Sequence, residues 1–424
     1  MSHTLLLQNA KLFSPMHGLH DKVVEILVKN GLIEAVGEGL GMAASELIDC
    51  EGAYVSAGWL DAFGVCPDPG EPWKESLQSY ADAAQQGGFV QVAALCGSAP
   101  KPDNESVIAQ VLQVGSNLRA EILPIGYATI QGDAKEMSEV HEMHRAGAVA
   151  FTDGIRCSAS VGLRYKIMQY TQSLSLNYLH FPYQKALAPD GKIHEGMVNA
   201  SLGMKGIPSI AETVELLADI EIAKYLKTPL RVMGISCSES VSLIRAAKKE
   251  GLKIYAAVPV MNLLYTDEAL LDFDENFKLL PPLRSENDRK SLLLGLLDGT
   301  LDAVVSNHHP EDIESKKVEF DYSAWGANTL AQVFPMMCKA FENETAENWL
   351  PLLYRGSRTF LGLPEHDIYV GAEASFTIFS IDGSYSAIED QNKSKAYNLP
   401  SPNAILKGCV LGTIRKGCYM KNDD

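Results

Sequence analysis

Short apolar runs alternate with longer amphipathic stretches through most of the chain. The short runs are typical of buried strands and lie at residues 53–60, 91–95, 121–126, 148–151, 175–180, 230–235, 253–258 and 303–306. Between most of them, apolar residues recur at helical spacing, at 73–86, 104–118, 136–145, 211–226, 238–251 and 285–297. Strands and helices that alternate on this scale predict an α/β fold, a (β/α)8 TIM-type barrel of parallel strands with helices outside.

The two ends of the chain have a different pattern. Residues 5–10 and 23–29 near one end, and 371–379 and 406–417 near the other, read as strands separated by short turns. Asn30-Gly31 directly follows one of these runs and is the strongest short signal for a β-hairpin turn. Periodicity alone does not say which of these distant strands pair with each other.

Composition narrows the class of protein. A length of 424 residues suits a large barrel with a smaller second domain. The net charge of −17 argues against binding to nucleic acid or to anionic membranes. The chain has no apolar run of about 18 residues, and its N-terminus lacks the basic and apolar segments of an export signal, so we expect a cytoplasmic protein. The eight cysteines include no CxxC pair, so we expect core thiols rather than a zinc ribbon or disulfides.

The first predicted barrel strand runs into a Pro/Gly-rich loop, at residues 57–70. This stretch resembles the first barrel strand of the metal-dependent amidohydrolases and, within them, of the dihydroorotases, whose motif is G-F-I-D-x-H-x-H-x-R-D-P-G. The positions that match are Gly58, Asp61, Asp68, Pro69 and Gly70. The two histidines of the motif fall on Phe63 and Val65, and its substrate-binding arginine falls on Pro67. The glycine, proline and aspartate positions that shape the motif are kept, and the residues that bind metal and substrate are absent.

The resemblance covers essentially the whole chain. Further blocks that match in register are Gly-Ile-Pro at 206–208, Pro-Pro-Leu-Arg at 281–284 and Asp-Gly-Thr at 298–300. The resemblance implies a barrel over residues 56–365. It also implies that 1–55 and 366–424 pair into one composite β-sandwich domain.

The other metal-binding and catalytic positions of the family are also replaced. A metal-assisted hydrolase needs imidazoles and carboxylates at the strand ends, to hold the ion and lower the pKa of its bound water. By resemblance, the second histidine pair falls on Met233 and Ser236, and a substrate-contacting asparagine falls on Leu280. The aspartate that binds metal and takes the proton of the water falls on Asn307, an amide that cannot accept a proton at neutral pH. We therefore expect an apolar barrel mouth, partly plugged by side chains.

Two polar residues remain at positions of the family's first shell. Asp153 keeps one of the two acids that follow the fourth strand, although an Asp before Gly is also a common turn residue. His180 ends the fifth strand, where a lone histidine is also a common core residue. Two ligands on separate strands would hold zinc weakly.

The leading interpretation is a catalytically silent, dihydroorotase-like protein of the pyrimidine biosynthesis setting, with a structural or regulatory role. We expect no catalytic residue, no bound metal and no other cofactor. The relic metal or pocket positions are Asp61, Phe63, Val65, Asp153, His180, Ser236, Asn307 and His308. By analogy with the family, the expected partners are aspartate transcarbamoylase or an active dihydroorotase, and the chain is expected to form a homo-oligomer.

Two alternatives stay open. The first is an active cyclic amide hydrolase of the dihydroorotase type with a rebuilt zinc site, whose ligands would come from His180, His308, His309 and either Asp153 or Asp61. Adjacent residues on a strand face opposite ways, so His308 and His309 could chelate one ion only from a loop. The second alternative is a small-molecule sensor that uses the emptied barrel mouth.

Overall fold

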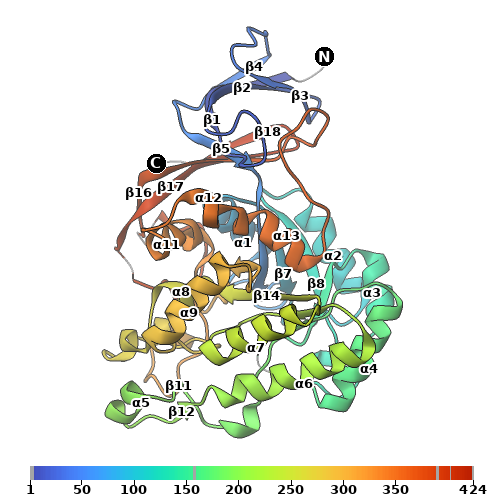
Figure 1. The fold of residues 1–424 in the computed structure, drawn as a ribbon, viewed down its shortest axis with the longest axis vertical. Helices are drawn as coiled ribbons and strands as arrows, with labels where there is room; N and C mark the ends of the chain where they lie inside the picture. The colour runs from blue at the N-terminus through green and yellow to red at the C-terminus, as the bar shows by residue number, and fades with distance from the viewer. Residues whose placement is uncertain (1–3, 156–158, 388–390, 402, 423–424) are drawn as a thin grey trace.

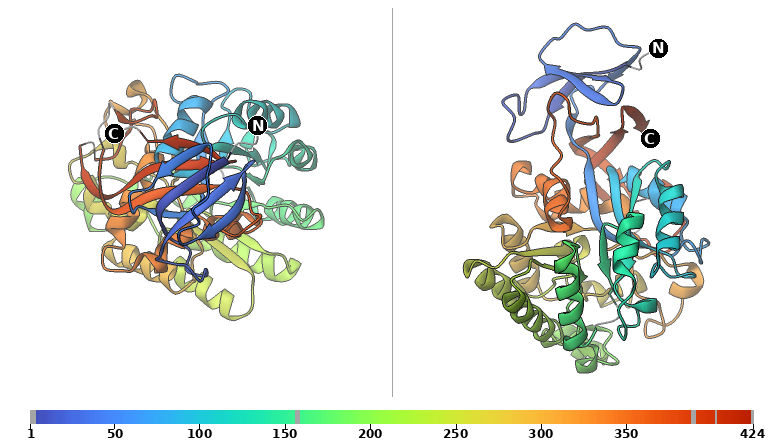
Figure 2. Two further views of the ribbon diagram at one scale, coloured as in Figure 1. Left: turned by 90° about the horizontal axis from the view of Figure 1, so that it is seen from above. Right: turned by 90° about the vertical axis from the view of Figure 1, so that its right-hand side faces the viewer.

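The computed structural model describes residues 4–155, 159–387, 391–401 and 403–422. A sheet built from both ends of the chain lies at the top of Figure 1, and a barrel surrounded by helices lies beneath it. The right-hand view of Figure 2 shows the same separation, with both ends of the described chain in the upper part. The predicted fold class, a (β/α)8 barrel with a small β domain formed by both termini, is confirmed.

Eight strands of the described chain form the barrel. They are β6 (Trp59–Cys66), β7 (Phe89–Cys96), β8 (Glu121–Tyr127), β9 (Ala150–Thr152), β10 (Leu179–His180), β13 (Leu230–Val232), β14 (Ile254–Pro259) and β15 (Ala303–Val305). They pair in parallel as β6-β7-β8-β9 and β10-β13-β14-β15, and a bridge between Phe151 and Tyr178 joins the two groups. The ring closes where the amide of Val65 donates to the carbonyl of His308 at 2.8 Å. All eight apolar runs singled out in the sequence supply a barrel strand.

Helices cover the outside of the barrel. The predicted ones are α1 (Leu77–Gln86), α2 (Glu105–Gly115), α3 (Val140–Ala146), α6 (Ile210–Leu226), α7 (Ser238–Lys249) and α9 (Glu286–Leu297). Those not predicted are α4 (Val161–Ser173), α5 (Met197–Leu202), α8 (Val260–Leu264), α10 (Ile313–Lys316), α11 (Val333–Ala340), α12 (Ala346–Trp349) and α13 (Arg355–Leu361). Helix α4 escapes a search for apolar periodicity because its buried face includes Arg164 and Thr171 beside Ile167 and Met168.

The terminal sheet joins the two ends of the chain. Its strands are β1 (Thr4–Leu12), β2 (Val23–Lys29), β3 (Leu32–Gly37), β4 (Glu46–Asp49), β5 (Tyr54–Ala57), β16 (Phe376–Ser386), β17 (Ile405–Arg415) and β18 (Cys418–Lys421). The order is β18-β17-β16-β5-β1-β2-β3, with β4 also on β1, so the antiparallel β5–β16 pair links the N-terminal strands to the C-terminal ones. The strands form one continuous sheet, whose N-terminal part lies above its C-terminal part in Figure 1. The boundaries 1–55, 56–365 and 366–424 stay predictions.

The Asn30-Gly31 hairpin is present. Strands β2 and β3 are antiparallel neighbours, and Lys29 pairs with Leu32 across the turn. Both turn residues have positive φ, 52° at Asn30 and 79° at Gly31. A two-residue turn of this kind matches the right-handed twist of the flanking strands, which explains why Asn-Gly predicts it.

An aromatic cluster holds the terminal sheet against the base of the barrel. Trp59 begins β6 and is fully buried between Phe379 of β16 and Phe334 of α11, with ring centroids 5.2 and 4.9 Å away. Its indole N–H donates to the hydroxyl of Ser56 at 2.9 Å. Because β6 leaves the sheet at this point, the carboxyl ends of the barrel strands lie at the far end of the molecule. The short strands β11 (Ile193–His194) and β12 (Gly206–Ile207) lie there, at the bottom of Figure 1.

Among the described residues, no helix combines the length and the apolar composition that a membrane-spanning segment needs. The seven described cysteines are free thiols, and five of them are buried, in line with the expected role as core residues. Cys157 lies outside the described residues.

Trp59→Ala should lower the free energy of unfolding by about 3–5 kcal/mol, because a large buried side chain leaves a cavity between sheet and barrel. Trp73→Ala is the matched control: Trp73 is 62% exposed, and its loss should cost about 1 kcal/mol or less. Urea unfolding of the two variants measures both values. Equal costs would show that the aromatic cluster does not hold the two parts together.

Candidate functional site

The mouth of the barrel, at the carboxyl ends of the strands, is filled by apolar side chains. Phe63 and Met233 are 1% exposed and Leu280 is 5% exposed. All three belong to one cluster that runs through the barrel interior, and Val65 packs against it. Each of the four stands at a position where the resemblance places a metal ligand or a substrate contact. At these four positions the mouth therefore carries apolar side chains.

Asp61 is part of the joint between the first and the last barrel strand. Its buried carboxylate accepts hydrogen bonds from the backbone amide of Ser306 at 2.8 Å and from the hydroxyl of the same residue. Burial raises the pKa of Asp61 to about 7, although these hydrogen bonds act in the opposite direction. The carboxylate oxygens are therefore engaged in the joint, which argues against Asp61 as a metal ligand.

Asn307, at the position of the catalytic base, is a hydrogen-bond donor to the backbone. It has a left-handed backbone conformation, with φ of 49°. Its backbone amide donates to the carbonyl of Phe63 at 3.2 Å, and its side-chain amide donates to the carbonyl of Leu280 at 3.2 Å. The side chain thus holds two neighbouring loops together and has no means of accepting a proton from water.

His308 and His309 lie in a loop after β15 and have different partners. The fully buried ring of His308 accepts a hydrogen bond from the amide of Thr329 at 3.1 Å, and its Nε2 lies 3.5 Å from Glu75. The Nε2 of His309 lies 3.7 Å from Glu311. The two imidazoles therefore point to separate carboxylates, and the structure does not bring them together around one ion.

His180 is held by a buried charge network. Its Nδ1 is hydrogen-bonded to the carboxylate of Asp219, which also accepts from Nε of Arg164 at 2.8 Å. The guanidinium of Arg164 forms a second ion pair, with Glu215. All four side chains are buried. Three members of this network were missed by the sequence analysis, which considered His180 alone.

One signal could have found part of the network. The acids Glu212, Glu215 and Asp219 recur at spacings of three and four along α6, so they share one helix face, and that face is buried. Buried acids require cations or donors close by. Nothing in the local sequence identifies Arg164, on a different helix, as the cation that pairs with two of them.

Asp153 has one satisfied and one unsatisfied carboxylate oxygen among the described residues. Its Oδ1 accepts from the backbone amide and the hydroxyl of Thr129, at 2.8 and 2.9 Å. Its Oδ2 is buried without a hydrogen-bond partner. Burial raises the pKa of Asp153, while the hydrogen bonds from Thr129 and, to a smaller extent, the nearby His180 lower it. Asp153 and His180 thus remain as neighbouring polar groups, on adjacent strands at the mouth.

Ser236, at a position of the second histidine pair, belongs to a second buried network. Its hydroxyl is hydrogen-bonded to the carboxylate of Glu212 and accepts from Nε of Arg284 at 2.7 Å. The same guanidinium lies 3.3 Å from Glu212 and 3.2 Å from Nδ1 of His194. Burial and the charge of Arg284 lower the pKa of His194. The arginine of the retained Pro-Pro-Leu-Arg block therefore supplies the positive charge at this part of the mouth.

The donor set at the mouth does not fit a zinc ion. A zinc site needs at least three protein ligands from imidazole, thiolate or carboxylate groups in a near-tetrahedral arrangement. Within the described ranges, no three such side chains are grouped so that they could hold a metal. Of the relic positions, Phe63, Val65, Ser236 and Asn307 offer no such group, and Asp61 and His308 have other partners.

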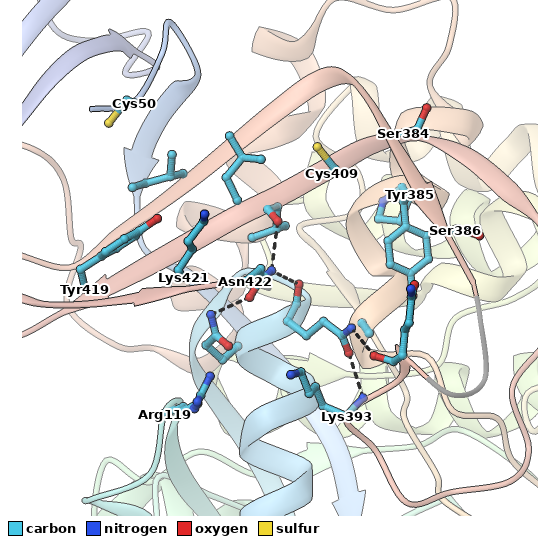
Figure 3. Close-up of a pocket in the computed structure, with 18 of the residues that line it drawn as sticks. Cys50, Arg119, Ser384, Tyr385, Ser386, Lys393, Cys409, Tyr419, Lys421 and Asn422 are labelled. Atoms are coloured by element: carbon cyan, nitrogen blue, oxygen red, sulfur yellow. Dashed lines mark hydrogen bonds between the residues drawn. The ribbon is translucent and has the colours of Figure 1, made fainter. Parts of the chain in front are cut away.

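A hollow lies at the opposite end of the barrel, between its base and the terminal sheet (Figure 3). Its volume is about 730 Å3, and its lining includes Arg119, Lys421 and Asn422. The amides that line it are bonded to each other: the side chain of Gln85 donates to that of Asn422 at 2.7 Å. None of the relic metal or pocket positions lines this hollow. The hollow is therefore separate from the family's site.

Comparison with known proteins agrees with the resemblance. A family model described as dihydro-orotase-like matches residues 67–240. A protein named dihydroorotase from Ruminiclostridium cellulolyticum is 32% identical over 417 residues, which is 97% of each chain. Another protein of that name, from Thermoanaerobacter sp., is 34% identical over 402 residues, 94% of this chain and 93% of its own.

The similar solved structures support the fold. An L-hydantoinase (dihydropyrimidinase) from Arthrobacter aurescens superposes with a TM-score of 0.87 at 20% identity, over 100% of this chain and 97% of its own. A dihydropyrimidinase from Brevibacillus agri superposes with a TM-score of 0.82 at 15% identity, over 100% and 95% of the two chains.

The buried carboxyl of Asp61 makes stability depend on pH in a defined direction. Its folded pKa, about 7, lies above the unfolded value of 3.8, so between these values the folded state holds a proton that the unfolded state has lost. The contribution of Asp61 to stability is therefore lost as pH rises from about 4 to 7, by up to about 1.4 kcal/mol per unit. Asp61→Asn should remove this loss.

The measurement is the difference in unfolding free energy between Asp61→Asn and the parent at pH 5 and pH 8. It should become more favourable to the variant at pH 8, whereas the exposed control Asp272→Asn should show no such trend. A difference that moves the other way would mean that Ser306 stabilises the charged carboxylate more than burial disfavours it.

Proposed function

Because this chain belongs to the dihydroorotase-like family of pyrimidine biosynthesis, we propose that it has kept the barrel of the family without the hydrolytic chemistry. It is a catalytically silent member with a structural or regulatory role. The observation that carries this proposal is the donor set of the mouth. Apolar side chains and an amide stand where a metal and a general base are needed.

The proposed loss of hydrolysis has more than one cause, because both the metal ligands and the general base are replaced. Hydrolysis of a cyclic amide needs an activated water and a group that takes its proton. The position of the base is Asn307, whose side-chain amide donates to Leu280. Without ligands to hold an ion and without a base, the restoration of one residue at a time should rescue nothing.

A second candidate is an active dihydroorotase-type hydrolase with a rebuilt site. The names of the similar proteins favour this candidate over a silent one. The residues that would serve it best are Asp153, whose buried Oδ2 is unpaired and whose pKa is raised, and the neighbouring His180. Asp153 would then accept the proton, so Asp153→Asn distinguishes the two candidates.

The direct test combines metal analysis with a dihydroorotase assay. The protein is stripped with a chelator, loaded with zinc and analysed for bound metal, and turnover is measured from dihydroorotate and from carbamoyl aspartate. We expect far less than one zinc per chain and no turnover, for the parent and for Asn307→Asp. One tightly held zinc per chain, or turnover that a chelator and Asp153→Asn both abolish, would establish the active candidate instead.

The proposed role requires partners. By family analogy we propose aspartate transcarbamoylase or an active dihydroorotase, together with self-association. The outer face of α6 supports association, because it leaves three apolar side chains in water: Ile210, Val214 and Leu217 are 53, 41 and 45% exposed. A helix that carries apolar residues on its outer as well as its inner face is typical of a buried position in an assembly.

Light scattering after gel filtration tests the association. The chain alone should elute as an oligomer, and a mixture with aspartate transcarbamoylase from the same organism should elute as a larger complex. The double variant Val214→Lys, Leu217→Lys should dissociate either the oligomer of this chain or its complex with aspartate transcarbamoylase. Leu294→Lys, which replaces a 61% exposed residue of α9, should leave both unchanged. A monomer that binds neither itself nor aspartate transcarbamoylase would contradict the proposed association.

A further inference from the structure

Two lysines are buried near the barrel mouth without a carboxylate partner among the described residues. Lys278 follows the short helical turn Glu275–Phe277, and Lys316 ends α10. They are 1% and 0% exposed. Burial lowers the pKa of each to about 8, so both are mainly charged at pH 7. A buried ammonium group is costly unless its donors are satisfied, so their surroundings matter.

Backbone carbonyls surround each ammonium group. Nζ of Lys278 donates to the carbonyls of Phe320, Asp321 and Ser323, at 2.6, 3.0 and 2.7 Å. Nζ of Lys316 donates to the carbonyls of Ala324 and Gly326, at 3.0 and 3.1 Å, and to that of Glu275. An ammonium group has three N–H donors, so each lysine uses its full capacity.

Five of these six carbonyls belong to one loop, residues 320–326. Carbonyl oxygens that converge on two points repel each other, because each carries partial negative charge. A cation at each point offsets that repulsion, so the loop can fold closely around the two ammonium groups. The two ammonium groups therefore fix the path of the loop together with Phe320, which is buried in the hydrophobic core.

The loop also contacts the apolar mouth through one side chain. Trp325 packs against the cluster that contains Phe63 and Leu280. Its ring lies 5.4 Å from Nζ of Lys278, within the range of a cation–π contact. The loop is tied further to the segment after β10, because Nζ of Lys192 donates to the carbonyl of Asp321 at 3.0 Å.

We propose that residues 317–326 form a lid over the barrel mouth and that the ammonium groups of Lys278 and Lys316 hold this lid shut as internal cations. The lid is closed by groups of the chain itself, so its closure needs no ligand in the barrel. The proposal does not depend on whether the barrel is silent, because it concerns access to the mouth and not the chemistry inside it.

The experiment is hydrogen exchange measured by mass spectrometry at pH 7 on the full chain. Lys278→Met and Lys316→Met keep the length of the side chain and remove its charge and donors. Each should raise the exchange rate of peptides that cover 317–326 by about tenfold or more, while peptides of β6, β7 and β8 keep their protection. Lys317→Met, at the exposed lysine next to Lys316, is the matched control and should exchange like the parent.

Chemical rescue separates the internal cation from a purely structural side chain. Lys278→Ala leaves space beside the three carbonyls, and ammonium chloride should restore the protection of 317–326. Tetramethylammonium chloride at the same ionic strength has no N–H donor and should restore nothing. Failure of ammonium to rescue would overturn the proposal. So would a loss of protection across the whole barrel in both methionine variants, since the lysines would then support the core and not a lid.

Discussion

The joint between the first and the last barrel strand decides what stands at the mouth. Backbone hydrogen bonds tie Val65 to His308 and Asn307 to Phe63, and Asp61 binds Ser306 one layer below. The groups that close the ring are mostly backbone, so the side chains above the joint can change without opening it. Burial of Phe63 instead contributes to stability, at about 25 cal/mol per Å2 of apolar surface. The barrel can therefore lose its chemistry and keep its fold.

The buried carboxylates at the mouth are balanced by the charges of two arginines. Asp219 and Glu215 share Arg164, and Glu212 is paired with Arg284. Removal of either arginine would leave an acid buried and unpaired, which is far more costly than the loss of an exposed ion pair. These networks give His180 and Ser236 separate partners, Asp219 and Glu212, so the positions of these two polar groups are explained without an ion. Lys278 and Lys316, which bind the lid, are satisfied in a similar way, by backbone carbonyls in place of carboxylates.

Much of the fold was predictable because its signals are local. The apolar runs that became β6 and β7, and the turn at Asn30-Gly31, depend on neighbouring residues alone. Helix α4 was not predictable in this way, because Arg164 stands on its buried face. The apolar mouth at Phe63 and Met233 could be predicted from the resemblance.

The partners of the polar residues could not be predicted, because they come from distant segments. Asp219 is 39 residues from His180, and Phe320 is 42 residues from Lys278. Such pairs are fixed by the path of the chain between strands, for which a local pattern carries no information. The spacing of Glu212, Glu215 and Asp219 was visible, but not the cations that balance them.

The claim that this barrel lacks the chemistry of its family is tested most directly by growth. A bacterium that lacks its own dihydroorotase needs uracil, and this chain is expressed in it with and without added zinc. The account predicts no growth without uracil, while the dihydroorotase of Ruminiclostridium cellulolyticum, expressed in the same way, restores growth. Growth without uracil on this chain alone would show that the mouth is catalytic and would contradict the account.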